Sequence, residues 1–193
     1  PSFYDNLLVS KEWPTVLTRP TDTLAGLSHQ LHFYNSTLWR EEDLARRNYA
    51  PDADIVKNKR AIDHFNQCRN NKIEAIDDLI LSKISLQLTE TSNMHRNCET
   101  AGSLFDRISI LSLKIFHMGK QAVRIDVTDQ HRVTAQSRET ILRDQRADLV
   151  ESLAWLLSGL ANGTAYYKIY RQFKMYNDPT LNPELVSETL KNS

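Results

Sequence analysis

The sequence LHFYNSTLWREEDLARR at residues 31–47, followed by KRAIDHFNQCRNNKIEAIDD at residues 59–78, determines how the rest of this chain is expected to fold. In both stretches the apolar residues recur every three or four positions, which is the period of an amphipathic α-helix. Amide and charged side chains, among them Asn35, Glu42 and Arg69, fall inside these apolar stripes instead of opposite them. We therefore expect two long helices that face each other with polar groups between them.

The helical period continues on both sides of these stretches. It predicts helices at about residues 22–48, 52–88, 102–118 and 128–160, and a short last helix that begins at Asn182-Pro183-Glu184. The third of these is apolar on nearly every face, which favours deep burial. Residues 1–21 contain two X-Pro steps and are expected to form a lead-in. Tyr166, Tyr170 and Phe173 share one face if residues 165–176 are helical, and such a helix would pack its aromatic side chains onto the bundle.

The two halves of the helical region, about residues 22–88 and 99–160, resemble each other. Moving the first half forward by 77 residues superimposes many apolar positions and several charged residues, among them Arg47 on Arg124, Arg69 on Arg146 and Glu74 on Glu151. Two duplicated hairpins that pack together give an antiparallel four-helix core. The predicted fold is therefore a single all-α domain over residues 1–193. We expect an antiparallel bundle of two repeated long hairpins with a four-helix core and a short C-terminal helical extension at residues 161–193.

The composition limits the class of protein. The chain has 24 Lys and Arg against 24 Asp and Glu, so its formal net charge of zero gives no overall attraction to nucleic acid or an anionic membrane. Five Gly and six Pro in 193 residues are few for the turns of an all-β protein. No run of about 18 apolar residues is present, so no membrane span is expected. The N-terminal residues show no signal-peptide pattern, and the two cysteines have no zinc-site spacing. We expect a cytoplasmic protein that binds no nucleic acid.

The polar residues in or beside the two apolar stripes are the candidate binding site. They are His32, Asn35, Trp39, Glu42, Arg46, Asp63, Asn66, Arg69, Asn70 and Asp77. A buried ion is costly unless it is partnered, so Glu42 and Arg69 are each expected to meet an opposite charge or a ligand. They can pair with each other, and Asp106 or Asp77 is an alternative partner. Buried ionic networks also occur simply to fix helix register, and that interpretation stays open.

Comparison of the two halves divides this set of residues. Arg69 and Glu74 recur in the second half, so they are interpreted as scaffold. The residues that change are Asn35, Glu42, Asn66, Asn70 and Asp77, which align with Ser112, Gly119, Arg143, Ala147 and Ala154. A shared architecture does not require residues that differ between its halves. A binding site is therefore expected on the first hairpin.

Carboxylates on the first hairpin also suggest a metal site. Glu42, Glu74 and Asp77 supply oxygen ligands, which Mg²⁺ and Mn²⁺ prefer. Acidic pairs on adjacent helices resemble those of the all-α nucleoside-triphosphate pyrophosphohydrolases, which hold magnesium against a triphosphate. Those enzymes carry a further Glu three residues after the first acidic pair. This chain has Ala45 there, so the motif is incomplete.

Four motifs resemble a known family. They are LHFYNSTLWREEDLARR, KRAIDHFNQCRNNKIEAID, ETAGSLFDRISILSLKIFHM and YRQFKMYNDP, and they closely resemble the bacterial family catalogued as domain of unknown function 4254. The resemblance covers about residues 31–179, and similar strings occur in surface-polysaccharide clusters beside glycosyltransferases. It implies a bacterial cytoplasmic protein tied to lipopolysaccharide or capsule synthesis, with glycosyltransferases or other glycan-assembly proteins as partners. It implies no activity and no catalytic residues.

Two functions and a purely structural oligomer remain open from the sequence, and with them the question of whether the protein is an enzyme. The first is an accessory or binding protein that works with glycan-assembly enzymes. The alternative is a metal-dependent phosphate or nucleotide hydrolase with its carboxylates on the first hairpin. Long helical hairpins also tend to dimerise, so a homodimer is expected, with Trp39 or residues 166–176 in the contact.

Overall fold

The computed structural model describes residues 3–11, 13–14, 22–84, 94–171 and 175–191, most of which are helical. In chain order the elements are α1 (Phe3–Leu8), α2 (Leu24–Ala45), α3 (Asp52–Ile84), β1 (His95–Arg96), α4 (Ala101–Ala122), α5 (Asp129–Ala161), β2 (Ala165–Tyr166), the 3₁₀ turn η1 (Met175–Asn177) and α6 (Pro183–Lys191). The prediction of an all-α helical bundle is confirmed. None of the described helices is long and apolar enough to cross a membrane.

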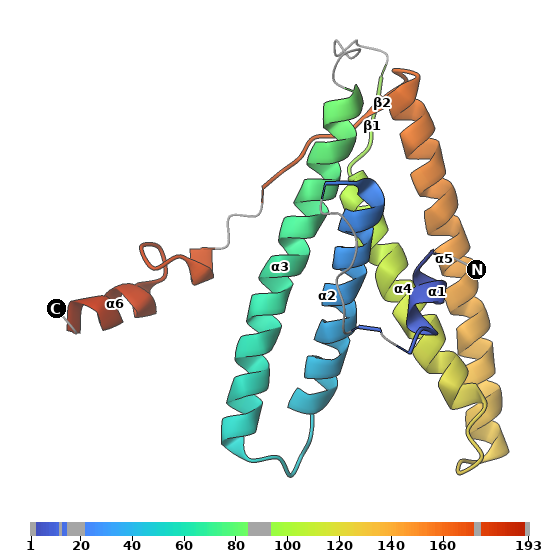
Figure 1. Ribbon diagram of the computed structural model, residues 1–193, viewed down its shortest axis with the longest axis vertical. Coiled ribbons are helices and arrows are strands. Elements are labelled where there is room, and N and C mark those ends of the chain that lie inside the picture. The colour runs from blue at the N-terminus through green and yellow to red at the C-terminus, as the bar shows by residue number, and fades with distance from the viewer. Residues whose placement is uncertain (1–2, 12, 15–21, 85–93, 172–174, 192–193) are drawn as a thin grey trace.

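The four long helices form two hairpins (Figure 1). α3 returns beside α2, and α5 returns beside α4, each after a short loop. α4 is the central helix, because it packs on α1, α2 and α3 as well as on α5. The hairpins diverge toward their loops (Figure 1). All four helices contribute to the buried core, which includes Leu31, Ile76, Leu104, Leu156 and Leu160.

Threonine residues begin three of these helices. The side-chain oxygens of Thr23, Thr100 and Thr128 each accept a hydrogen bond from the backbone N–H three residues later. The start predicted at about residue 22 is slightly early, because Thr23 caps α2 and the helix begins at Leu24.

A short helix, α1, lies within residues 1–21, where the sequence pattern indicated only a lead-in. α1 packs on α4, and its Tyr4 is buried. The ring of Tyr4 stacks on the ring of His32 in α2, with 4.6 Å between the centroids. α1 therefore covers one side of the place where α2 and α4 meet.

The aromatic segment after α5 is not helical in residues 165–171, so that prediction is wrong there. Gly163 ends α5 in the left-handed region, with a φ of 68°, which glycine adopts without strain. The chain then extends, and β2 pairs in parallel with β1 through the N–H of His95, which donates to the carbonyl of Thr164 at 2.9 Å. Phe173 lies outside the described residues.

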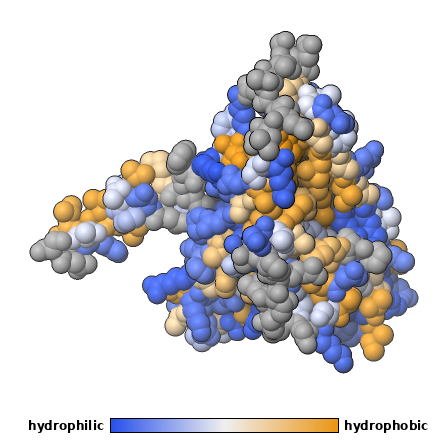
Figure 2. All heavy atoms as spheres, turned by 45° about the horizontal axis from the view of Figure 1, so that its top comes forward, coloured by the Kyte–Doolittle hydropathy of each residue, from blue (hydrophilic) through white to orange (hydrophobic). Residues whose placement is uncertain are grey.

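α6 projects away from the bundle (Figure 1). Its apolar residues are not buried, and Leu190 is 74% exposed. Figure 2 shows these apolar atoms on the tail that stands apart from the body of the molecule. The short helix predicted from Asn182-Pro183-Glu184 is thus present, beginning at Pro183.

Candidate functional site

A buried polar network joins α2 to α4. The Nδ1 atom of His32 lies 2.8 Å from the hydroxyl of Ser109. The amide of Asn35 donates to that hydroxyl at 3.0 Å and to the carboxylate of Asp106 at 2.9 Å. The two members on each helix are three positions apart, which places them on one face of it. All four side chains are buried.

Burial shifts the pKa values of His32 and Asp106, the two titratable members of this network. Burial lowers the pKa of His32 to about 3, with His29 acting in the same direction and Asp5 opposing it. Burial raises the pKa of Asp106, against the effects of its hydrogen bond from Asn35 and the positive charge of Arg69. Since its four side chains are buried and hydrogen-bonded between the two helices, the network fixes how α2 and α4 cross.

An open pocket, the Arg69 pocket, lies beside this network, between α2, α3 and α4. Its cavity volume is about 330 Å³. It is lined by Asn35, Leu38, Trp39, Glu42, Asp43, Arg46, Asn66, Arg69, Ile110 and Leu113. Six candidate residues from the sequence therefore line one pocket: Asn35, Trp39, Glu42, Arg46, Asn66 and Arg69.

Arg69 forms no ion pair within the part of the chain that the structure describes. Its Nη2 reaches the side-chain oxygen of Asn70 only at 3.5 Å, and its buried Nε has no hydrogen-bond acceptor. The expected Arg69–Glu42 pair is wrong, because Glu42 accepts from Arg46 one turn later on the same helix, at 2.5 Å. The Glu42 side chain is 42% exposed, so it lies at the rim and is not a buried ion. Nor does Arg69 pair with Asp77 or Asp106.

Four other candidate residues lie outside this pocket. His32 belongs to the closed network, and Asn70 is buried on α3. Asp63 pairs with Lys59 one turn earlier on α3. Asp77 accepts from the backbone N–H of Gly102 at 2.7 Å, which ties α3 to the first turn of α4.

The three predicted metal ligands have separate partners. Glu42 pairs with Arg46, and Glu74 pairs with Arg171 at 2.9 Å. Asp77 holds the start of α4. Across the described ranges, no three His, Cys, Asp or Glu side chains are grouped closely enough to hold a metal ion. The Mg²⁺ or Mn²⁺ site stays a prediction, and these contacts give each carboxylate a different role.

A larger cavity, the Trp39 cavity, adjoins the Arg69 pocket and shares Trp39 and Asp43 with it. It has a volume of about 620 Å³ and lies between α2, α4 and α5. The indole of Trp39 stacks parallel to the ring of His117, with centroids 4.5 Å apart. Lys114 and Arg138 add positive charge to its lining. The sequence pattern missed these two residues, because only the packing of α5 on α4 brings them to the cavity.

Comparison with known proteins gives one match. Residues 26–169 match the family described as "Protein of unknown function (DUF4254)". No curated protein and no solved structure matches the chain. The matched range spans both hairpins and includes Arg69 and Trp39, but it excludes α1.

Proposed function

Because this chain belongs to the DUF4254 family of proteins of unknown function, and membership brings no activity with it, we propose a function from the site itself. The protein is a ligand-binding accessory protein of bacterial surface-polysaccharide assembly, and it presents a sugar-containing ligand to glycosyltransferases or related partners. The site of binding is the Arg69 pocket together with the adjoining Trp39 cavity.

One observation carries this proposal: six of the candidate side chains, from α2 and α3, line one open pocket. The guanidinium of Arg69 in that pocket has no ion-pair partner among the described residues, and its buried Nε has no acceptor. Scaffold residues in a bundle are usually satisfied by their neighbours, as the Asn35 amide is by Asp106 and Ser109. Arg69 is not. A partly buried cation without a carboxylate partner is what a site for a polar ligand leaves in the unliganded protein.

The sizes and the chemistry of the two cavities support a small polar ligand. Volumes of about 330 and 620 Å³ fall in or near the usual range for ligand pockets. Amide and guanidinium groups from Asn66 and Arg69 suit hydroxyl and acidic groups. Trp39 supplies an apolar ring against which a sugar face can pack. The link to polysaccharide assembly rests on the resemblance of the sequence motifs to proteins of such gene clusters.

The hydrolase alternative has less support. It requires Glu42, Glu74 and Asp77 to act together on a metal ion. In the structure each of them has a different partner: Glu42 pairs with Arg46, Glu74 pairs with Arg171, and Asp77 accepts from the first turn of α4.

Binding calorimetry against neutral sugars, acidic sugars, sugar phosphates and nucleotide sugars tests the proposal. We expect at least one class to bind with one site per chain, and Trp39→Ala to weaken binding at least tenfold. The matched control is Trp155→Ala, because Trp155 is 54% exposed on α5 and lines neither cavity. Equal binding by the two tryptophan variants, or no binding by any class, would show that the pocket is not the site.

A further inference from the structure

The Arg69 pocket has a counterpart in the second hairpin. This second pocket, the α1 pocket, lies between α1, α4 and α5 and has a volume of about 400 Å³. Six of its lining residues stand 77 positions after six residues of the Arg69 pocket. Among them, Ile115, Phe116 and Arg143 correspond to Leu38, Trp39 and Asn66. The two pockets therefore occupy equivalent places on the two hairpins.

A contact at the centre of the molecule supports this equivalence. His32 and Ser109, which touch at 2.8 Å, are themselves 77 residues apart. The 77-residue offset that aligns the two hairpins in sequence therefore also relates two residues that touch in the structure.

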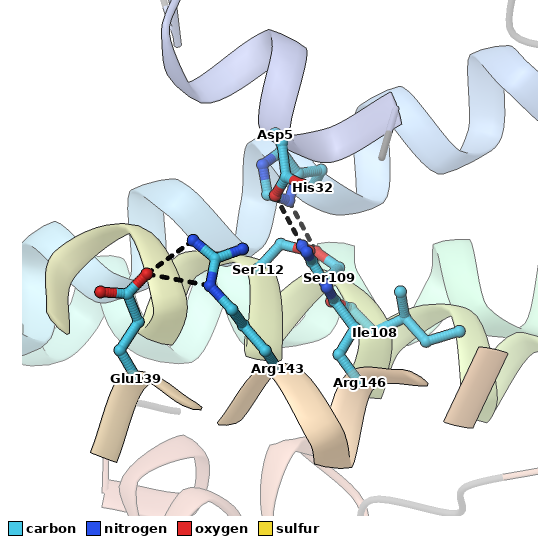
Figure 3. Close-up of polar contacts among 8 residues, drawn as sticks. All are labelled: Asp5, His32, Ile108, Ser109, Ser112, Glu139, Arg143 and Arg146. Atoms are coloured by element: carbon cyan, nitrogen blue, oxygen red, sulfur yellow. Dashed lines mark hydrogen bonds and ion pairs between the residues drawn. The ribbon is translucent and has the colours of Figure 1, made fainter. Parts of the chain in front are cut away.

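The counterpart of Arg69 is Arg146, and it has a carboxylate partner (Figure 3). The Nη1 atom of Arg146 donates to the carboxylate of Asp5 at 2.6 Å and to the hydroxyl of Ser112 at 3.0 Å. Ser112 is the counterpart of Asn35. Asp5 comes from α1, which contributes to the lining of the α1 pocket, and no α1 residue lines the Arg69 pocket.

The missing carboxylate defines the chemistry of the ligand group. The planar fork of an arginine matches a carboxylate or a phosphate through paired N–H···O bonds. The positive charge of Arg69 acts to lower the pKa of Asp106, but the two side chains form no ion pair. The Asp106 carboxylate instead accepts a hydrogen bond from Asn35. Glu42 is held by Arg46. Resting on the function proposed above, we propose that Arg69 binds the acidic group of the ligand, a carboxylate or a phosphate, at the place where Arg146 holds Asp5.

Three sugar probes separate the outcomes, each measured by calorimetry on the full chain at constant ionic strength. Glucose 1-phosphate and glucuronate carry the two acidic groups, and methyl glucoside carries none. We expect one or both acidic probes to bind at least tenfold more tightly than methyl glucoside. The tighter of the two identifies the source of the negative charge as a phosphate ester or a sugar acid.

Two variants locate the acidic group. Arg69→Gln is expected to reduce the affinity for the acidic probes to that for methyl glucoside. Its matched control, Arg143→Gln, removes an exposed arginine of the α1 pocket that is paired with Glu139 and should leave binding within twofold. Asn66→Asp places a carboxylate one turn before Arg69 on the same helix. It should also abolish the preference for acidic probes, while raising the melting temperature.

The results distinguish this proposal from the function on which it rests. If all three probes bind equally and Arg69→Gln changes nothing, the pocket binds a ligand but Arg69 does not recognise an acid, and the present proposal is wrong. If no probe binds, the present proposal is wrong, and the function on which it rests falls as well if nucleotide sugars also fail to bind. A loss of acidic preference in both Arg69→Gln and Asn66→Asp, with Arg143→Gln unchanged, supports both.

Discussion

Replacing His32 by Gln should remove much of the acid sensitivity of folding. His32 is fully buried between the rings of Tyr4 and Trp13, at centroid distances of 4.6 and 5.2 Å. Since Asn35 donates to the Ser109 hydroxyl, the hydroxyl proton is left to donate to Nδ1 of His32. A second proton on this imidazole would reverse that bond and create a positive charge among aromatic rings.

The pKa of His32 gives the size of the effect. Burial lowers it to about 3 from an ordinary value of 6.5. Because the folded value is the lower one, the unfolded chain takes up the proton first, and the free energy of unfolding falls as the pH drops below about 6.5. From about pH 7 to about pH 5 the linkage relation gives a loss of about 2 kcal/mol. That corresponds to a decrease of about 4–8 °C in melting temperature for a chain of this length.

Urea unfolding of the wild type and His32→Gln, followed by circular dichroism over this pH range, measures the loss. The buried Asp77 and Asp106 act in the opposite sense, because burial raises each pKa and stability falls as the pH rises through the raised value. Both proteins contain these carboxylates, so the difference between the two curves isolates His32. His131→Gln, at an exposed position on α5, is the control. Parallel pH profiles for the wild type and His32→Gln would refute the reasoning.

Two further substitutions test the packing around the site. Gly102→Ala should lower the free energy of unfolding in urea by about 1–3 kcal/mol, because a Cβ there would sit within 2.9 Å of the Asp77 carboxylate and closer still to a backbone carbonyl. The same change at Gly119, where the nearest atom is at 3.4 Å, should cost nothing; similar losses at both glycines would contradict the tight joint between α3 and α4. Asp5→Asn should cost about 2 kcal/mol by leaving the partly buried Arg146 without its carboxylate. It should also add a second anion site per chain in calorimetry, and an unchanged stoichiometry would count against the equivalence of the two pockets.

The helices and the unusual side chains of the first hairpin are predictable from the sequence. Apolar spacing fixes the angular position of every residue around a helix, so the sequence alone assigns Asn35 and Arg69 to the buried stripe. The same reasoning places Glu42 in that stripe. It does not foresee that Arg46, one turn later, holds the Glu42 carboxylate at the rim. Periodicity locates a Cα, whereas a long side chain has rotamers that reach the surface.

Other parts of the site depend on contacts between distant segments, which periodicity does not report. α1 has only six residues, and the signal for it is limited to the spacing of Phe3, Tyr4, Leu7 and Leu8. Its Asp5 becomes informative only when it is seen against Arg146, which lies 141 positions later. The 77-residue offset is visible in the sequence as a similarity. Only the structure shows that residues related by it also touch.

The difference between the Arg69 pocket and the α1 pocket follows from the position of α1, which lines only the second of them among the described residues. Two equivalent hairpins have two equivalent arginines, Arg69 and Arg146, each at the edge of a buried core. α1 lies over the second hairpin, where Asp5 supplies a carboxylate to Arg146 and the rim position carries Gly119. At the corresponding position the first hairpin has Glu42, whose pair with Arg46 forms a polar rim. The bundle thus has one pocket beside an arginine that is paired within the protein, and one pocket whose arginine is left to bind an anion from outside the described chain.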